Sequence, residues 1–501
     1  MSNQVFQNVR NLTPGRSMFD LSYEKKFTAD MGQLIPVLCD EAMPGDFFQF
    51  GNETVIRFQP LVAPILHEIY QYVHIFFVPY RLLWDEWEDF ISGGVDGAYS
   101  DAPPEWGPAG SPPVLNNAEG SLWDFFGFPV DVDPVGAYPL DFPRRAYNLV
   151  YNEYYRDETL QDEVALDNDV ILNRNWEKDY FTSSLIEQQR GVAPALPISG
   201  FTSAVWSTGS FASGTPGGIG FAPGNNKLFI PGGLVTEARN FMNDNTIDLS
   251  TASTFDIADL RLAFQIQKFM ERNSRSGVRY TEFLKAHYGV SPRDDRMQRP
   301  EYVGGSKSPV IISEVLQTSS TDVTSPQGNL AGHGISVNAQ FCGKYKALEF
   351  GLFIGIMSVM PRPAYSQGID RQWLRKTRYD FPFPEFVNLS EQAITKAEIC
   401  ATNVESHNID IFGYQGRFDE CRTKQNQVCS GMRTTFDYWH LARKFDLAAP
   451  PVLNEEFIEC IPRKDIFAVP SEPGLIISHG NKIIAYRPLP IQAEPGLIDH
   501  N

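Results

Sequence analysis

The sequence predicts a mainly β protein, in which one sandwich of strands carries long loop and helix insertions. Three observations predict it. Residues 69–78 alternate as a strand does and are apolar on both faces. Aromatic residues make up 13% of the chain, and aromatic residues favour strands and broad buried surfaces. Strand-like runs stand on both sides of a middle region of loops and helices, which favours one interrupted sandwich over two successive domains.

The N-terminal residues 1–30 are polar with isolated apolar positions. They predict an extended arm lying on a neighbouring surface, or with equal weight a frayed terminus. Residues 33–39 are the first convincing strand. Two shorter strands are expected at 45–50 and 54–58, separated by the turn-like pair Gly51-Asn52.

The run 69–78 is the predicted central strand, and Pro79 ends it because proline cannot donate a ladder hydrogen bond. Since both of its faces are apolar, another layer must cover its outer side. Residues 82–91 have helical spacing and stop at Gly93-Gly94, so we expect a short helix that acts as a lid.

Residues 95–190 are predicted to be an acidic, proline-rich insertion within a single domain that spans 31–501. Between 95 and 170 there are 15 Asp and Glu against three Arg and no Lys. This composition indicates a loop-dominated, solvated region, with one helix near 147–156. A cation site is conceivable there, but the D-x-[DN]-x-[DN]-G spacing of a calcium loop is missing.

Within the stretch 191–250, residues 191–235 are rich in Gly, Ser, Thr and Pro, yet they carry aromatic residues and almost no charge. A plain linker seldom carries so many rings, so we interpret this stretch as a protruding loop that serves binding or assembly. The candidate contact residues are Phe201, Trp206, Phe211 and Phe221.

A helical insertion is predicted at 255–300, and its clearest helix spans 256–272. Apolar residues cover most of the circumference of this helix, which predicts burial on most sides with one basic stripe. Ten Lys and Arg against five Asp and Glu between 261 and 308 make the region locally basic. Together with a second basic cluster it gives the candidate residues that face nucleic acid: Arg261, Lys268, Arg272, Arg371, Arg375, Lys376 and Arg378. The alternative for each is an ordinary ion-paired surface or inter-subunit contact.

Strands dominate again after residue 309. We expect them at 310–316, 335–342, 350–360, 429–438 and 482–486.

The net charge of −19 argues that the molecule as a whole is not built to bind nucleic acid or an anionic membrane. The six cysteines form no C-x-x-C pair, and no secretory signal is recognised, so reduced thiols in a cytosolic setting are expected. The longest apolar run, 350–360, is too short to cross a bilayer. We therefore expect a soluble protein without membrane insertion.

Motifs for catalysis and for cofactors are missing. The eight histidines form no H-E-x-x-H and no close pair with metal-ligand spacing, and neither G-x-S-x-G nor a Walker A loop occurs. His440 follows Asp437 closely, but no serine or cysteine is placed by sequence to use it. The sequence predicts no enzyme, no catalytic residue, no metal and no cofactor.

Several segments carry a family resemblance. They are RFQPLVAPILHEIYQYVHIFFVPYRLLWDEWEDFI (57–91), RSGVRYTEFLKAHYGV (275–290), RPEYVGGSKSPVIISEVLQTSS (299–320), GNLAGHG (328–334), FGYQGRFDECR (412–422) and PGLIDH (495–500). They resemble the major capsid proteins of the Microviridae, small bacteriophages with single-stranded DNA, and above all the gokushovirus branch. The resemblance implies an eight-stranded antiparallel jelly roll, the viral coat sandwich, with long insertions.

The resemblance also implies the function. The expected role is the major capsid subunit of a T=1 icosahedral shell, with pentamers building 60 copies around circular single-stranded DNA. Expected partners are this genome, a small basic DNA-binding and packaging protein, a minor pilot protein and a bacterial surface receptor contacted by the protruding loop. The expected location is the virion, assembled in the host bacterial cytoplasm.

The alternative function is that of a β-sandwich carbohydrate-binding protein or glycoside hydrolase. Such a protein would want a signal peptide and an aromatic platform beside paired carboxylates. A monomer with affinity for glycans on size-exclusion chromatography would favour it.

Overall fold

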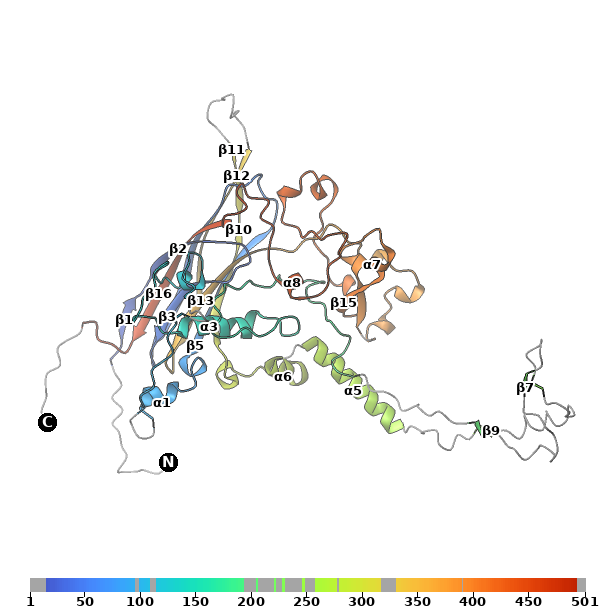
Figure 1. Ribbon diagram of the computed structural model, residues 1–501, viewed down its shortest axis with the longest axis horizontal. Helices are drawn as coiled ribbons and strands as arrows, with labels where there is room; N and C mark the ends of the chain where they lie inside the picture. Colours follow the sequence, from blue (N-terminus) through green and yellow to red (C-terminus); the bar gives the residue numbers. More distant parts are fainter. Residues whose placement is uncertain are drawn as a thin grey trace, which may run out of the picture. The chain divides into compact units, whose positions relative to one another are not determined.

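The computed structural model describes residues 15–94, 99–108, 114–192, 257–276, 279–316, 330–389 and 391–492, with four short pieces at 204–205, 220–221, 228–229 and 246–247. The chain divides into two compact units (Figure 1). One unit combines residues 1–188 with 276–501, and the other spans 189–275.

The core of the larger unit consists of two antiparallel sheets (Figure 1). The first has the order β1-β16-β4-β12-β11, with β2 also paired to β16, and the second has the order β10-β5-β13-β3. The prediction of a mainly β sandwich is confirmed, whereas the count of eight strands stays a prediction, since the two main sheets hold six and four strands. The strands are β1 (Ser17–Asp20), β2 (Tyr23–Ala29), β3 (Ile35–Ala42), β4 (Phe47–Phe58), β5 (Ile69–Pro79), β10 (Glu301–Val310), β11 (Ile312–Leu316), β12 (Leu330–Lys346), β13 (Gly351–Pro361) and β16 (Leu475–Arg487).

Smaller elements complete the described residues. The other strands are β6 (Ala204–Val205), β7 (Gly220–Phe221), β8 (Leu228–Phe229), β9 (Thr246–Ile247), β14 (Gln392–Thr395) and β15 (Ile411–Gln415). The helices are α1 (Trp87–Ser92), α2 (Leu122–Phe125), α3 (Phe142–Val150), the π-helical η2 (Tyr151–Tyr155), α5 (Ile257–Ser276), α6 (Tyr280–Tyr288), α7 (Glu405–Ile409) and α8 (Glu455–Ile458). The 3-10 turns are η1 (Tyr80–Leu82), η3 (Asp294–Met297), η4 (Arg371–Trp373), η5 (Arg378–Asp380), η6 (Pro384–Phe386), η7 (Lys396–Glu398), η8 (Asp419–Cys421), η9 (Ser430–Arg433) and η10 (Asp437–Trp439).

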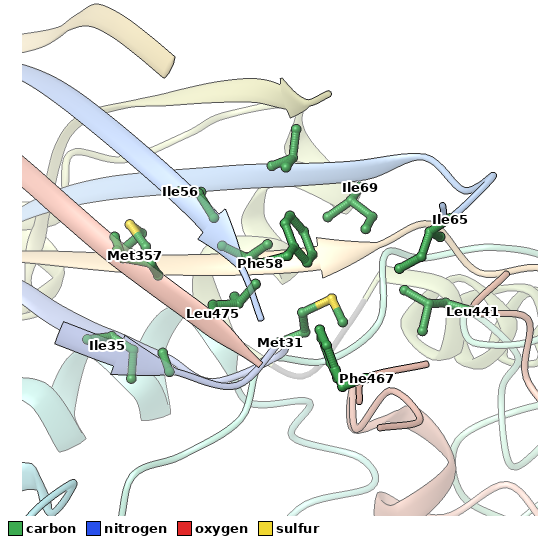
Figure 2. Packing of buried hydrophobic residues seen from close by; sticks show 14 of the residues in the cluster. Met31, Ile35, Ile56, Phe58, Ile65, Ile69, Met357, Leu441, Phe467 and Leu475 are labelled. Carbon is green, nitrogen blue, oxygen red and sulfur yellow. The ribbon is translucent and has the colours of Figure 1, made fainter. Parts of the chain in front are cut away.

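The central strand is β5, as predicted. It lies between β10 and β13, and nearly every residue along it is buried or half-buried. Its inner face supplies Ile69 and Val73 to one apolar cluster, part of which is shown in Figure 2. The same face supplies Ile75 and Phe77 to a second cluster, where the Phe77 ring lies 5.3 Å from that of Phe353.

The outer face of β5 is covered, as its apolar pattern requires, but the cover comes chiefly from the acidic insertion. Phe76 and Val78 pack in one cluster with Trp106, Trp123 and Tyr147 of that insertion. Of the lid predicted at 82–91, Leu83 is buried in this cluster and Trp87 packs against it, but the helix α1 begins only at Trp87 and contributes no fully buried residue. In the described part of the insertion, helices α2 and α3 and the π-helical η2 are joined by turns and loops. The prediction that it stays solvated is wrong on the side that meets the sheet, because its tryptophans pack there.

A buried ion network lets this acidic insertion pack against a sheet. The Arg144 guanidinium lies 2.6 Å from one oxygen of Asp141 and 2.7 Å from Asp169. It also lies over the Trp106 ring at 5.0 Å. Each charge therefore has a partner inside the layer, which removes most of the cost of burying it.

Two strand predictions were wrong in detail. The expected break at Gly51-Asn52 lies inside β4, because Asn52 is buried and Gly51 gives the close approach that β12 requires: a Cβ atom there would sit 3.2 Å from the Gln340 carbonyl oxygen. The strand expected at 429–438 is replaced by the turns η9 and η10, and Ser430 has a positive φ of 59° that a strand cannot continue through.

The described part of the predicted N-terminal arm is extended and joins the chain's own sheet. Strand β1 pairs with the end of β16, and β2 pairs with its beginning. The helix expected near 147–156 begins earlier, at Phe142, with Pro143 in its first turn. It continues into η2, whose tyrosines line the outer face of the second sheet.

Candidate functional site

The first basic candidate group lies on α5, in the unit 189–275. Arg261, Lys268 and Arg272 are exposed and share one face of this helix, as their spacing predicts. The prediction that the helix is buried on most sides is wrong: Leu262 is 59% exposed and Phe269 is 47% exposed. The sequence period found the stripe correctly, but it cannot say whether an apolar face is covered within the same chain.

In the second basic group, Arg371 and Arg375 form ion pairs with buried carboxylates, whereas Lys376 and Arg378 are exposed. The Arg371 guanidinium lies 2.7 Å from Glu398, and Arg375 lies 2.7 Å from Glu420. Both carboxylates are almost fully buried. These two arginines therefore neutralise buried carboxylates and hold distant segments together, so they are poorly available to an external phosphate.

Glu398 shows how completely such a carboxylate is engaged. It accepts hydrogen bonds from the Thr395 backbone N–H at 3.0 Å and from the Tyr180 hydroxyl at 3.1 Å, besides its Arg371 pair. Burial raises the pKa of Glu398, and the charge of Arg371 opposes this effect. This site connects η4, η7 and the segment around residue 180 into one structural node.

Lys376 and Arg378 remain exposed, among exposed aromatic rings. Trp373 is 75% exposed, and the Arg378 guanidinium lies 4.6 Å from the centre of the Tyr379 ring. A pocket of about 280 Å³ is lined by Trp373 and Lys424, and also by the carboxylates of Asp370, Glu398 and Glu420. Cationic groups next to open rings suit single-stranded nucleic acid, whose bases stack and whose phosphates need positive charge.

The candidate contact residues of the protruding loop cannot be located in the same way. Phe201, Trp206 and Phe211 lie outside the described residues. Phe221 is the second residue of β7, which pairs with β8 in a short ladder.

The His440 ring is held by the backbone around it. His440 Nε2 lies 2.8 Å from the Met432 carbonyl oxygen, and its Nδ1 accepts from the Ala442 N–H at 3.1 Å, so both ring nitrogens have backbone partners. All six cysteines are unpaired. Within the described ranges, no group of three or more His, Cys, Asp or Glu side chains is placed to hold a metal ion, and no helix is long and apolar enough to cross a membrane.

The fold and these sites define a structural β-sandwich protein in which the ion pairs and histidines hold packed layers together. The comparisons with known proteins give the family. The chain belongs to the phage capsid protein family: the model described as "Capsid protein (F protein)" matches residues 7–497. It is therefore a major capsid subunit of a small phage of the Microviridae type, with a structural and not an enzymatic role.

Relatives match along nearly the full chain. The "Capsid protein VP1" of Chlamydia phage 1 is 33% identical, with 98% of this chain and 97% of the relative covered. The VP1 of Bdellovibrio phage phiMH2K is 34% identical, with 94% of this chain and 93% of the relative covered. The VP1 of Spiroplasma virus 4 is 28% identical, with 96% of this chain and 95% of the relative covered. The likeness thus spans nearly the whole chain.

Proposed function

We propose that sixty copies of this subunit form a T=1 icosahedral shell around circular single-stranded DNA, with pentamers as building blocks. The observation that carries the proposal is the match from residue 7 to 497 to a capsid family that includes relatives of nearly equal extent. Closed point symmetry then turns one chain into a container without further components. Assembly takes place in the host bacterial cytoplasm, and the finished location is the virion.

The insertion 191–250 is the proposed host-contact element, projecting at the three-fold axes. Its support is compositional: rings at Phe201, Trp206, Phe211 and Phe221 in a stretch with almost no charge. Its partner in this proposal is a receptor on the bacterial surface. The separation of residues 189–275 as a compact unit of its own supports an element that can vary independently of the sandwich.

Replacing residues 192–245 by a short Gly-Ser loop tests this element. Shells should still form, because the sandwich and its covering layer lie in the other unit. Attachment to host cells should be lost. A matched variant in which only the four aromatic residues become serine should also assemble and fail to attach. Insoluble protein from both variants would contradict the proposal and assign the stretch to the folding core.

The exposed cationic residues are the proposed genome-facing groups. Arg261, Lys268 and Arg272 of α5 and Lys376 and Arg378 beside Trp373 are accessible to phosphates. Arg371 and Arg375 contribute indirectly, by holding the η4 segment in place. These five residues can neutralise only a few phosphates, and the subunit's net charge of −19 opposes further DNA binding. We propose that a small basic packaging protein supplies the remaining positive charge. A minor pilot protein is a further proposed partner.

The affinity of the purified subunit for single-stranded DNA, measured over a series of salt concentrations, tests whether a basic companion protein is needed. Binding should be weak near physiological salt, with a shallow slope of log affinity on log salt, since each neutralised phosphate adds only about 0.7 to the slope. Addition of a basic peptide should restore retention of DNA in shells. Tight binding with a steep slope by the subunit alone would contradict the need for a companion protein.

A further inference from the structure

A cavity of about 630 Å³ lies where the covering layer leaves the outer face of the second sheet partly open. Its floor comes from Tyr72 and His74 of β5, Tyr302 of β10 and Met360 of β13. Its wall comes from η2 and from the segment 174–178. Its volume is in the range of small-molecule sites, and aromatic side chains make up much of its lining.

One guanidinium in this cavity has no countercharge. Arg174 lies 4.2 Å from the centre of the Tyr72 ring, and its Nη1 donates to the Ser358 hydroxyl at 3.1 Å. Among the described residues no carboxylate forms an ion pair with it. The other charges at the cavity are matched: Lys178 is paired with Asp157 at 2.6 Å, and Arg299 with Asp294 at 2.7 Å.

The remaining charges do not cancel this positive site. Glu177 is engaged by Lys307 at 3.1 Å. Burial lowers the pKa of His74 to about 4, and the charge of Arg174 adds to the effect, so the ring is neutral near pH 7. The His74 Nδ1 is hydrogen-bonded to the Tyr155 hydroxyl at 2.8 Å. The Arg174 guanidinium is therefore the one positive charge at the cavity that no described carboxylate balances, and an anionic group of a ligand would balance it.

A set of three rings provides the apolar side of the cavity. The Phe76 ring lies 4.8 Å from that of Tyr154 and 5.5 Å from that of Tyr302. Tyr302 is 49% exposed, so it is the ring of the three that can take a further planar group. A ligand suited to both features joins a planar ring to an anion.

We propose that this cavity binds a nucleotide, with the phosphate at the Arg174 guanidinium and the base against Tyr302. Arginine binds phosphate through two or more N–H groups, and bases of any sequence stack on aromatic rings. In a coat subunit the source is the packaged single strand or a free nucleotide, and this choice rests on the proposed genome-enclosing function. A neighbouring cleft of about 310 Å³ shares Tyr154 and Arg299 with this cavity, but its own Arg279 is paired with Glu158 at 2.9 Å, so the site proposed here stays at Arg174.

The test measures binding of 5′-deoxyadenosine monophosphate, deoxyadenosine, inorganic phosphate and an eight-residue oligodeoxyadenylate to the full-length subunit by calorimetry. The monophosphate should bind saturably and at least tenfold more tightly than either the nucleoside or phosphate alone. Arg174→Gln should lower that affinity at least tenfold. Arg57→Gln, at an exposed arginine of β4 on the other sheet, is the matched control and should leave it unchanged.

A second variant keeps the test decisive if Arg174→Gln does not fold. Tyr302→Leu, at the half-exposed ring, should weaken monophosphate binding about fivefold or more and leave phosphate binding unchanged. Tighter binding of the oligonucleotide per site than of the monophosphate assigns the cavity to the packaged strand, and equal binding assigns it to free nucleotide.

Three results would overturn the proposal: no saturable binding, equal binding by phosphate alone, or equal loss in the Arg57 control. Shells that assemble normally while nucleotide binding is absent would reject the cavity alone and leave the shell function standing.

Discussion

The Thr54 hydroxyl lies 2.8 Å from Nδ1 of His479 in the interior of the sandwich, between the two apolar clusters of its core. Gln71 donates to the same hydroxyl oxygen at 2.9 Å, so the Thr54 hydrogen is free to donate to the imidazole. Asn481 donates to the Val37 carbonyl oxygen beside them at 2.9 Å. This buried polar group connects strands of both sheets and fixes their mutual register.

His479 makes the subunit sensitive to acid. Burial lowers its pKa from 6.5 to about 4, so the folded state favours the neutral ring. The unfolded chain binds a proton below about pH 6.5, and the free energy of unfolding therefore falls as pH drops from 6.5 towards 4, by up to about 3 kcal/mol from this group. Urea unfolding of the unassembled subunit at pH 7.5 and 4.5 measures the loss. His479→Gln should lose less stability over this interval, and an unchanged pH dependence would contradict the assignment.

A charge on the inner face of β5 should prevent folding. Ile69 and Phe77 are each 1% exposed, and Ile69→Asp or Phe77→Asp places an unpaired carboxylate among apolar side chains. The cost is several kcal/mol, a large share of the roughly 5–15 kcal/mol of a typical domain. Soluble expression measures the effect. Ile484→Asp, on the exposed face of β16, is the control and should express normally; soluble protein from the β5 variants would show that β5 is not central.

Arg371 and Lys376 should behave differently although both belong to one basic cluster. Arg371→Met leaves Glu398 buried without its cation and should cost about 3 kcal/mol. Lys376→Met, at an exposed position, should change stability by less than about 0.5 kcal/mol. Chemical denaturation measures both. Equal small effects would mean that the Arg371–Glu398 pair contributes nothing to the fold.

The apolar positions of α5 should tolerate polar substitution in the unassembled subunit. Leu262→Ser removes a side chain that is 59% exposed, so the free energy of unfolding should change by less than about 1 kcal/mol. The thermal midpoint of the subunit measures it, with Leu352→Ser at a 3% exposed position as the destabilising comparison. A large loss at Leu262 would restore the sequence-based expectation that this helix is covered within its own chain.

The strands could be predicted because their pattern is local. The alternation at 69–78 predicted β5 and its need for a cover, and the apolar run at 350–360 predicted β13. The sequence could not show which segment covers the outer face of β5. The composition of 95–170 is acidic, which indicates a solvated loop, and its tryptophans are isolated in the sequence and form no periodic pattern. Only the fold shows that the ring centres of Trp106 and Trp123 lie 5.3 Å apart and that both side chains are fully buried.

The site residues show the same limit. Spacing placed Arg261, Lys268 and Arg272 on one helix face, since steps of seven and four residues return to the same side of a single helix. It could not separate Arg371 from Lys376, because the partner Glu398 lies 27 positions away. Arg174 gave no signal at all: its neighbours Tyr72 and Ser358 come from β5 and β13, far from it in the chain.

The central claim is that this chain alone contains the information to build a closed shell. Electron microscopy of the purified protein after removal of nucleic acid tests it most directly. We predict that the purified chain alone forms uniform, closed, icosahedral particles of sixty subunits. Monodisperse monomers under every assembly condition, or open sheets and tubes in place of closed particles, would contradict the claim.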